Sequence, residues 1–160
     1  MKNVQSGFTL VELMVVVAVL GILLGIGVPG MSQMLASSRV SSAASEFQLA
    51  LQGARSLALT QRERYTVCPA DAEKCADSEN WSAGWATYKG GADGVRVQQH
   101  VLSGVDVISD TDDFSFNAMG YLEPAVPRTI TLSANDGQAQ RWLCVSASGK
   151  TSVSRSSCEH

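Results

Sequence analysis

The chain has 160 residues, a formal net charge of −3, 45% apolar residues and four cysteines. Nucleic-acid-binding domains are usually basic, so this mildly acidic composition disfavours a general nucleic-acid-binding surface. The length accommodates one membrane segment and one modest domain.

A long apolar segment begins close to the N-terminus. Residues 13–28 carry no charged or strongly hydrogen-bonding side chain, and Glu12 is the lone carboxylate before them. As a helix, Phe8–Val28 would measure about 31 Å at roughly 1.5 Å per residue, which is enough to cross a bilayer once. The segment is too long for a secretory signal core and no Ala-x-Ala cleavage site follows it. A plain single-pass anchor remains an alternative.

Glu12 calls for a partner. A carboxylate inside a membrane segment costs about 2.5–3.5 kcal/mol on insertion scales, so its presence predicts a compensating cation. Cleavage after Gly7 would create an amine at Phe8, about one helical turn from Glu12.

The one-charge leader, the Gly7–Phe8 junction, Glu12 and the apolar run together resemble the class III signal of type IV pilins and type II secretion pseudopilins. The resemblance implies that a prepilin peptidase cleaves after Gly7 and methylates the amine of Phe8. It also implies that Glu12 pairs with the N-terminal amine of a neighbouring subunit in a filament.

The helical pattern changes character after Pro29. Proline removes a backbone hydrogen bond, so a kink or a local loss of helix is expected at Pro29. Residues 35–64 are amphipathic, with a core-forming stripe at spacings of three and four: Val40, Ala43, Ala44, Phe47, Ala50, Leu51, Ala54, Leu57, Ala58 and Gln61. Leu49 falls opposite this stripe, as a singly exposed leucine or as a contact with another filament subunit.

Short runs separated by turn residues follow Arg64 and predict a β-domain for the helix stripe to pack on. The expected strands are Tyr65–Cys68, Gly84–Lys89, Val95–Val101, Val105–Ile108, Phe114–Asn117, Thr129–Ser133, Arg141–Ser146 and Lys150–Ser154. Residues 90–94 and 135–137 have turn chemistry. Residues 70–82 are interpreted as an acidic surface loop held by a disulfide bond.

All four cysteines lie beyond the apolar segment. Proximity in sequence suggests the pairs Cys68–Cys75 and Cys144–Cys158, although four thiols allow three pairings. Zinc is the alternative, but the spacings of these cysteines match the tight hooks of structural zinc sites poorly. An exported domain in an oxidising compartment favours disulfide bonds.

The sequence contains no catalytic or cofactor-binding motif that we recognise. His100 and His160 are isolated, no metallohydrolase or serine-hydrolase motif is present, and we expect neither enzymatic activity nor a cofactor or metal. The residues 110–113 are interpreted as a solvated acidic turn, with a calcium site as the weaker alternative. Trp81, Trp85 and Trp142 are expected to pack in the interior rather than to form a binding surface.

Residues 116–120 (Phe-Asn-Ala-Met-Gly) and the cysteine-bearing last hairpin resemble the GspH/FimT branch of the pilin family, which includes FimU minor pilins. Some FimT-type pilins carry a C-terminal Gly-Arg-x-Arg that grips DNA. This chain has Gly149-Lys150-Thr151-Ser152 at the corresponding place, with Arg141 and Arg155 nearby. Lysine lacks the bidentate fork of arginine, so DNA contact through Arg141, Lys150 and Arg155 is a less favoured hypothesis.

These observations predict an α+β type IV pilin fold, with a long N-terminal helix packed on a C-terminal antiparallel β-domain. The expected parts are a leader (1–7), a transmembrane and filament-core helix (8–35), an amphipathic helix (36–64) and a β-rich globular domain (65–160).

The resemblance implies a minor pilin of a type IV pilus that acts in assembly or initiation, with roles in twitching motility, adhesion and DNA uptake. A type II secretion pseudopilin H and a DNA-binding minor pilin for natural transformation are the alternatives. The implied partners are other minor and major pilins, the prepilin peptidase and an inner-membrane assembly platform. Before assembly the chain would span the inner membrane once with a periplasmic domain; after assembly it would lie in the extracellular pilus.

Overall fold

The computed structural model describes residues 8–70, 75, 81–91, 93–134 and 136–159, with the backbone alone for residues 26–29. The chain divides into two units, residues 1–35 and 36–160. We call Phe8–Leu35 the N-terminal segment and Ala36–His160 the β-unit. The predicted leader, including Gly7, lies outside the described residues, as does His160.

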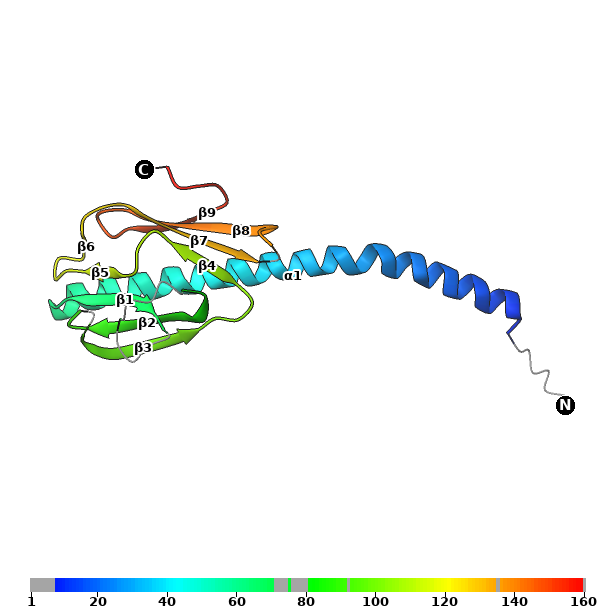
Figure 1. Cartoon of the computed structure of the whole chain (residues 1–160), viewed down its shortest axis with the longest axis horizontal. Coiled ribbons are helices and arrows are strands. Elements are labelled where there is room, and N and C mark those ends of the chain that lie inside the picture. Colours follow the sequence, from blue (N-terminus) through cyan, green and yellow to red (C-terminus); the bar gives the residue numbers. More distant parts are fainter. Residues whose placement is uncertain (1–7, 71–74, 76–80, 92, 135, 160) are drawn as a thin grey trace. The chain divides into compact units, whose positions relative to one another are not determined.

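One helix, α1 (Leu10–Gln61), runs through both units (Figure 1). It begins after Thr9, whose hydroxyl accepts a hydrogen bond from the Glu12 amide at 3.3 Å, while the Glu12 carboxylate accepts one from the Thr9 amide at 3.5 Å. This reciprocal pair is a capping box, which satisfies amides that have no partner within the helix.

The helix ends at Gln61 because Arg62 adopts a positive φ of 52°, a left-handed conformation that stops helices. The amphipathic helix predicted to reach Arg64 is therefore three residues shorter. The backbone stays helical through Pro29, so local loss of helix is not observed there. The kink at Pro29 stays a prediction.

The β-unit contains two antiparallel sheets, placed beside the later turns of α1 in Figure 1. The five-stranded sheet has the order β3-β2-β1-β5-β6, built from β1 (Tyr65–Pro69), β2 (Gly84–Lys89), β3 (Val95–Val101), β5 (Phe114–Phe116) and β6 (Leu122–Glu123). The four-stranded sheet has the order β4-β7-β8-β9, built from β4 (Asp106–Ser109), β7 (Arg128–Ala134), β8 (Ala139–Val145) and β9 (Thr151–Ser154). A short 3-10 helix, η1 (Trp81–Ala83), precedes β2.

Every strand expected from the sequence is present, with ends shifted by at most two residues. The pattern missed β6, which has two residues and exists through its pairing with β5. Such a short strand has no alternation of its own to detect. The loop expected at residues 70–82 lies mostly outside the described residues.

The core of the β-unit forms where the α1 stripe meets the inner faces of both sheets. Phe47 lies at its centre, stacked on Trp85 with ring centroids 4.4 Å apart and 5.2 Å from the Trp81 ring. The stripe is buried at Val40, Ala43, Ala44, Phe47, Leu51, Ala54 and Ala58, and partly buried at Ala50 and Leu57. Gln61 is exposed instead, and its side chain accepts a hydrogen bond from the Tyr65 hydroxyl at 2.7 Å.

Candidate functional site

The N-terminal segment exposes its apolar side chains. Those of Phe8 and of the large apolar residues from Leu10 to Leu24 are 48–83% exposed. Within the described residues, α1 is the one helix long and apolar enough to cross a membrane. Exposed apolar surface of this extent needs a bilayer or other apolar helices to cover it.

Glu12 lies in the first turn of this exposed helix. Its carboxylate turns back to the amide of Thr9, the residue that follows Phe8. No cationic side chain of the described residues forms an ion pair with it. The bond expected to be cleaved joins Gly7, outside the described residues, to Phe8, which is 83% exposed. The geometry therefore directs the carboxylate toward the end of the chain where an amine would be created.

Sequence reasoning missed the second role of Glu12 as the acidic partner of a capping box. The signal was available, because Thr9-x-x-Glu12 is the pattern Ser/Thr-x-x-Glu that marks helix starts. The cap also explains why the helix begins at Leu10 and not at Phe8.

Two disulfide bonds lock parts of the β-unit. Cys68 is bonded to Cys75 and Cys144 to Cys158, with Cα–Cα distances of 5.6 and 5.7 Å. The pairing favoured by sequence proximity is confirmed. The second bond ties the chain that follows β9 to strand β8.

The three residues of the DNA hypothesis do not form one cluster. Strand β9 pairs with β8 so that Trp142 faces Ser154, which places Arg141 and Arg155 at one end of β9. Lys150 lies at the other end, in the turn before Thr151, about 16 Å away at roughly 3.3 Å per residue. The Arg141 guanidinium donates to the Gln140 carbonyl at 2.7 Å. DNA contact stays a prediction.

The acidic turn at residues 110–113 is organised by its own hydrogen bonds. Asp110 accepts one from the Thr129 amide at 3.1 Å, and Asp113 accepts one from the Ser115 hydroxyl at 2.6 Å. No group of three or more His, Cys, Asp or Glu side chains suited to a metal occurs in the described part of the chain.

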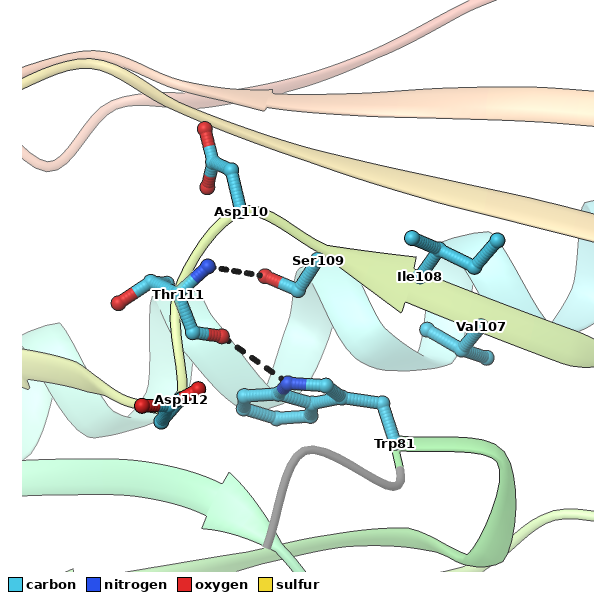
Figure 2. A pocket seen from close by; sticks show the side chains of 7 residues that line it. All are labelled: Trp81, Val107, Ile108, Ser109, Asp110, Thr111 and Asp112. Atoms are coloured by element: carbon cyan, nitrogen blue, oxygen red, sulfur yellow. Dashed lines mark hydrogen bonds between the residues drawn. The ribbon is translucent and has the colours of Figure 1, made fainter. Parts of the chain in front are cut away.

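A pocket of about 310 Å³ opens beside this turn (Figure 2). It is lined by Trp81, Val107, Ile108, Ser109, Asp110, Thr111 and Asp112. The indole nitrogen of Trp81 donates to the Thr111 carbonyl at 3.1 Å, so this tryptophan closes one side of the pocket. Trp81 and Trp85 are buried, as expected from the sequence, while Trp142 is partly buried.

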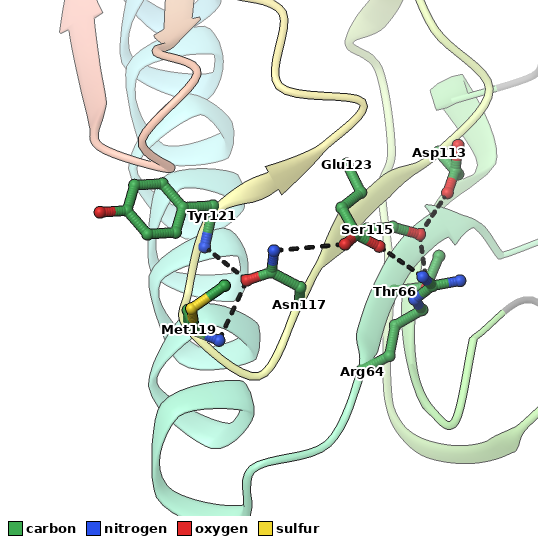
Figure 3. Close-up of polar contacts among 8 residues, drawn as sticks. All are labelled: Arg64, Thr66, Asp113, Ser115, Asn117, Met119, Tyr121 and Glu123. Carbon is green, nitrogen blue, oxygen red and sulfur yellow. Dashed lines mark hydrogen bonds and ion pairs between the residues drawn. The ribbon is translucent and has the colours of Figure 1, made fainter.

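The turn at residues 116–120, which carried part of the family resemblance, is organised around Asn117 (Figure 3). The Asn117 side-chain oxygen accepts hydrogen bonds from the amides of Met119 (3.0 Å) and Tyr121 (3.1 Å). Its side-chain nitrogen donates to Glu123 at 3.2 Å, and Glu123 forms an ion pair with Arg64. The motif thus encodes a braced turn.

Comparison with known families decides the identity. Residues 43–149 match the family model of the type II transport protein GspH, which covers most of the β-unit. The chain belongs to the GspH family. Residues 2–28 match the model of the prokaryotic N-terminal methylation motif.

Individual relatives are fimbrial proteins. The chain is 28% identical over 159 residues to a fimbrial protein of Moraxella nonliquefaciens, covering 93% of this chain and 90% of the relative. It is 52% identical over 46 residues to the type IV major fimbrial protein FimA of Dichelobacter nodosus, a match that covers 29% of this chain and 30% of that protein.

Among solved structures, the type IV minor pilin FimU of Pseudomonas aeruginosa PAO1 matches with a TM-score of 0.59 and 22% identity. The match covers 73% of this chain and 89% of FimU. The GspH-family chain therefore has the predicted type IV pilin fold. It is related to structural proteins, and its apolar N-terminal helix with a methylation motif fits membrane anchoring followed by incorporation into a pilus.

Proposed function

We propose that this chain is a minor pilin that is processed after Gly7, methylated on Phe8 and assembled with other pilins into a type IV pilus, where it takes part in initiation. One observation carries the proposal: an exposed apolar helix start whose lone carboxylate, Glu12, turns toward the N-terminal end. The match of residues 2–28 to the methylation motif supports it.

Processing creates a cation that can pair with the Glu12 carboxylate. Hydrolysis of the Gly7–Phe8 bond adds one water and leaves a carboxylate on the leader and an ammonium on Phe8. After loss of a proton, that nitrogen takes a methyl group from a donor of the sulfonium class, which leaves as a thioether, and the methylated nitrogen is again cationic. Before assembly, the N-terminal segment spans the inner membrane and the β-unit lies in the periplasm.

Assembly then moves the N-terminal segment from lipid into a bundle of homologous helices. The lipid and the bundle can each cover its apolar side chains. In this low-dielectric setting a carboxylate needs a cation, and the ammonium of a neighbouring subunit supplies one. Because the two charges lie at defined places on parallel helices, their pairing sets the axial register of the incoming subunit.

The direct test is the mass of the N-terminal peptide of the protein purified from sheared fibres. We expect the peptide to begin with methylated phenylalanine. Gly7→Leu should keep the leader and be absent from fibres. Gly21→Ala is the matched glycine control, because the space around a Cβ at Gly21 is open, and it should be processed normally. An intact leader on the wild-type protein would overturn the proposal.

The family model gives one specific reason to weigh a second function, that of a type II secretion pseudopilin. Deletion of the gene separates the two. A pilus function predicts loss of surface pili and of twitching with normal protein secretion, and a pseudopilin function predicts the reverse.

A further inference from the structure

Strand β3 is an open edge of the five-stranded sheet (Figure 1). It pairs with β2 along one side, and within the described residues no hydrogen bond joins its backbone to a partner on the other side. The outward amides and carbonyls of an edge strand are the same groups that pair strands inside a sheet. β3 therefore carries a row of hydrogen-bonding groups that another strand can use.

The other three sheet edges are closed by contacts within the chain. An amide of β4 donates to the Ser82 hydroxyl at 2.9 Å, and an amide of β6 donates to the Ala147 carbonyl at 3.2 Å. A carbonyl of β9 accepts a hydrogen bond from the Gln48 side chain at 3.2 Å. Each of these contacts occupies backbone that an added strand would need. Of the four edges, β3 is the one that the described residues leave open.

β3 also has few of the features that protect free edges. Natural edge strands are often short, carry lysine or proline, or contain a bulge. β3 has seven residues with neither lysine nor proline, and Val95, Val97 and Val101 are 74%, 51% and 70% exposed. The register with β2 shifts at Val97, but Gln98–Val101 pair with β2 without interruption. A regular and exposed stretch of this kind can accept an added strand.

Arg96 gives the open edge a cation without a partner. Its side chain is exposed, and among the described residues it forms no ion pair. Lys89 of β2 is already paired with Glu63 at 3.3 Å, and Glu46 of α1 with His100 at 2.7 Å. A strand that carries a carboxylate would therefore complement the charge of this edge.

These features exclude a second copy of this chain as the partner. The β4, β6 and β9 edges of a second copy are closed, so it could pair only through its own β3. β3 contains no Asp or Glu that could face Arg96 in any register. Pairing of two β3 strands would also make a closed, isologous contact, which does not continue along a filament. The partner is therefore a different chain that presents an extended acidic segment.

We propose that β3 pairs with an extended, carboxylate-bearing segment of a different pilin, which adds a strand to the five-stranded sheet. The backbone of Gln98–Val101 supplies hydrogen bonds, and the carboxylate pairs with Arg96. This inference rests on the proposed function, because assembly into a fibre is what brings a different pilin beside β3.

Amide hydrogen exchange of the processed full-length protein measures the backbone pairing. The peptide that covers β3 should exchange about tenfold or more slowly in sheared fibres than in detergent micelles, because the added strand would bond the outward amides. The peptide that covers β4 is the control, since this edge is already bonded to Ser82 and its exchange should change little. Equal exchange of the β3 peptide in the two samples would overturn the proposal.

A photo-crosslinker identifies the partner. Val97→p-benzoylphenylalanine, in cells that assemble pili, should give after irradiation an adduct in sheared fibres that maps to an acidic segment of a different pilin. Val126→p-benzoylphenylalanine is the matched control, because Val126 is 48% exposed and lies outside β3, and it should give no adduct with that segment. An adduct that joins two copies of this chain, or that maps to lipid or to a protein other than a pilin, contradicts the proposal.

A charge reversal measures the ion pair. Arg96→Glu should lower the amount of the protein in fibres about fivefold or more relative to processed protein in the membrane, because like charges facing each other across a strand pair are unfavourable. Arg96→Lys keeps the charge and should restore most of the loss. Arg62→Glu is the control, since Arg62 is an exposed arginine outside β3. Equal amounts of Arg96→Glu and Arg62→Glu in fibres would show that no carboxylate faces Arg96.

The outcomes distinguish this inference from the proposed function. Wild-type protein that is processed and present in fibres, but with an unprotected β3, overturns the strand addition and leaves the proposed function standing. Absence of the wild-type protein from fibres overturns both.

Discussion

The N-terminal segment and the β-unit meet the same physical requirement in opposite ways. The β-unit covers its apolar side chains by itself and, among the described residues, leaves no buried side-chain nitrogen or oxygen without a partner. The N-terminal segment leaves its apolar side chains exposed and has one carboxylate without a cationic partner in the described chain. The β-unit thus buries its own apolar side chains, whereas those of the N-terminal segment need a membrane or other apolar helices to cover them.

The self-sufficiency of the β-unit depends most on Phe47, which is fully buried against Trp81, Trp85 and Phe114. Phe47→Ala should lower the free energy of unfolding by about 3–5 kcal/mol, as measured by urea denaturation of residues 36–160. Leu49→Ala, two residues along the same helix but exposed, should change it by less than about 0.5 kcal/mol. Equal effects would show that the helix stripe is not the core.

The disulfide bonds should make the next largest contribution to the free energy of unfolding of the β-unit. Replacing Cys144 and Cys158 by serine should lower the free energy of unfolding by about 3 kcal/mol in the chain-entropy model, because the bond closes a loop with a sequence separation of 14. Replacing Cys68 and Cys75, with a separation of 7, should cost about 2.5 kcal/mol. Unfolding that is unchanged by a reducing agent would contradict both expectations.

A smaller effect is expected at the braced turn. Asn117→Ala removes the acceptor of two backbone amides, so the unfolding free energy should fall by about 1–2 kcal/mol. Asn117→Asp keeps an acceptor oxygen but places a second carboxylate beside Glu123, and should restore only part of the loss. If Asn117→Ala is as stable as the wild type, the turn is held by the hydrogen bond from the Arg55 Nε to the Gly120 carbonyl and by the last hairpin alone.

The smallest effect is expected from the N-terminal segment itself. Removing residues 1–35 should change the unfolding free energy of the β-unit by less than about 0.5 kcal/mol relative to the full-length chain in detergent. A large loss would mean that the two regions stabilise each other, and the contrast between them would not hold.

Much of the fold could be predicted because periodicity reports burial. The spacing of three and four around Phe47 placed the core face of α1, and alternation with turn residues placed the strands. Three features could not be predicted in this way, because they depend on contacts between residues that a local sequence pattern does not report. β6 depends on β5 as a partner, Gln61 turns to the Tyr65 hydroxyl, and the end of α1 depends on the left-handed Arg62.

The candidate site residues also divide into those that the sequence could predict and those that depend on the fold. Gly7, Phe8 and Glu12 could be proposed from the sequence, because a single carboxylate within an apolar segment stands out without any knowledge of the fold. The surroundings of Met119 and Tyr121 could not be predicted, because Leu59 of the helix meets a turn sixty positions further on, and because the exposure of both side chains depends on how Asn117 and Gly120 shape the turn. The basic residues near β9 looked close in sequence, yet strand pairing separates Lys150 from Arg141 and Arg155.

We predict that assembly requires the charge of Glu12 and not its capping role. The most direct measurement is the amount of Glu12→Gln and of Thr9→Ala in sheared fibres, normalised to processed protein in the membrane. Glu12→Gln keeps a cap acceptor without charge and should be processed but reduced about tenfold or more in fibres, while Thr9→Ala, which removes the cap hydroxyl, should be assembled nearly as the wild type. Wild-type incorporation of Glu12→Gln, or a loss confined to Thr9→Ala, would contradict the account.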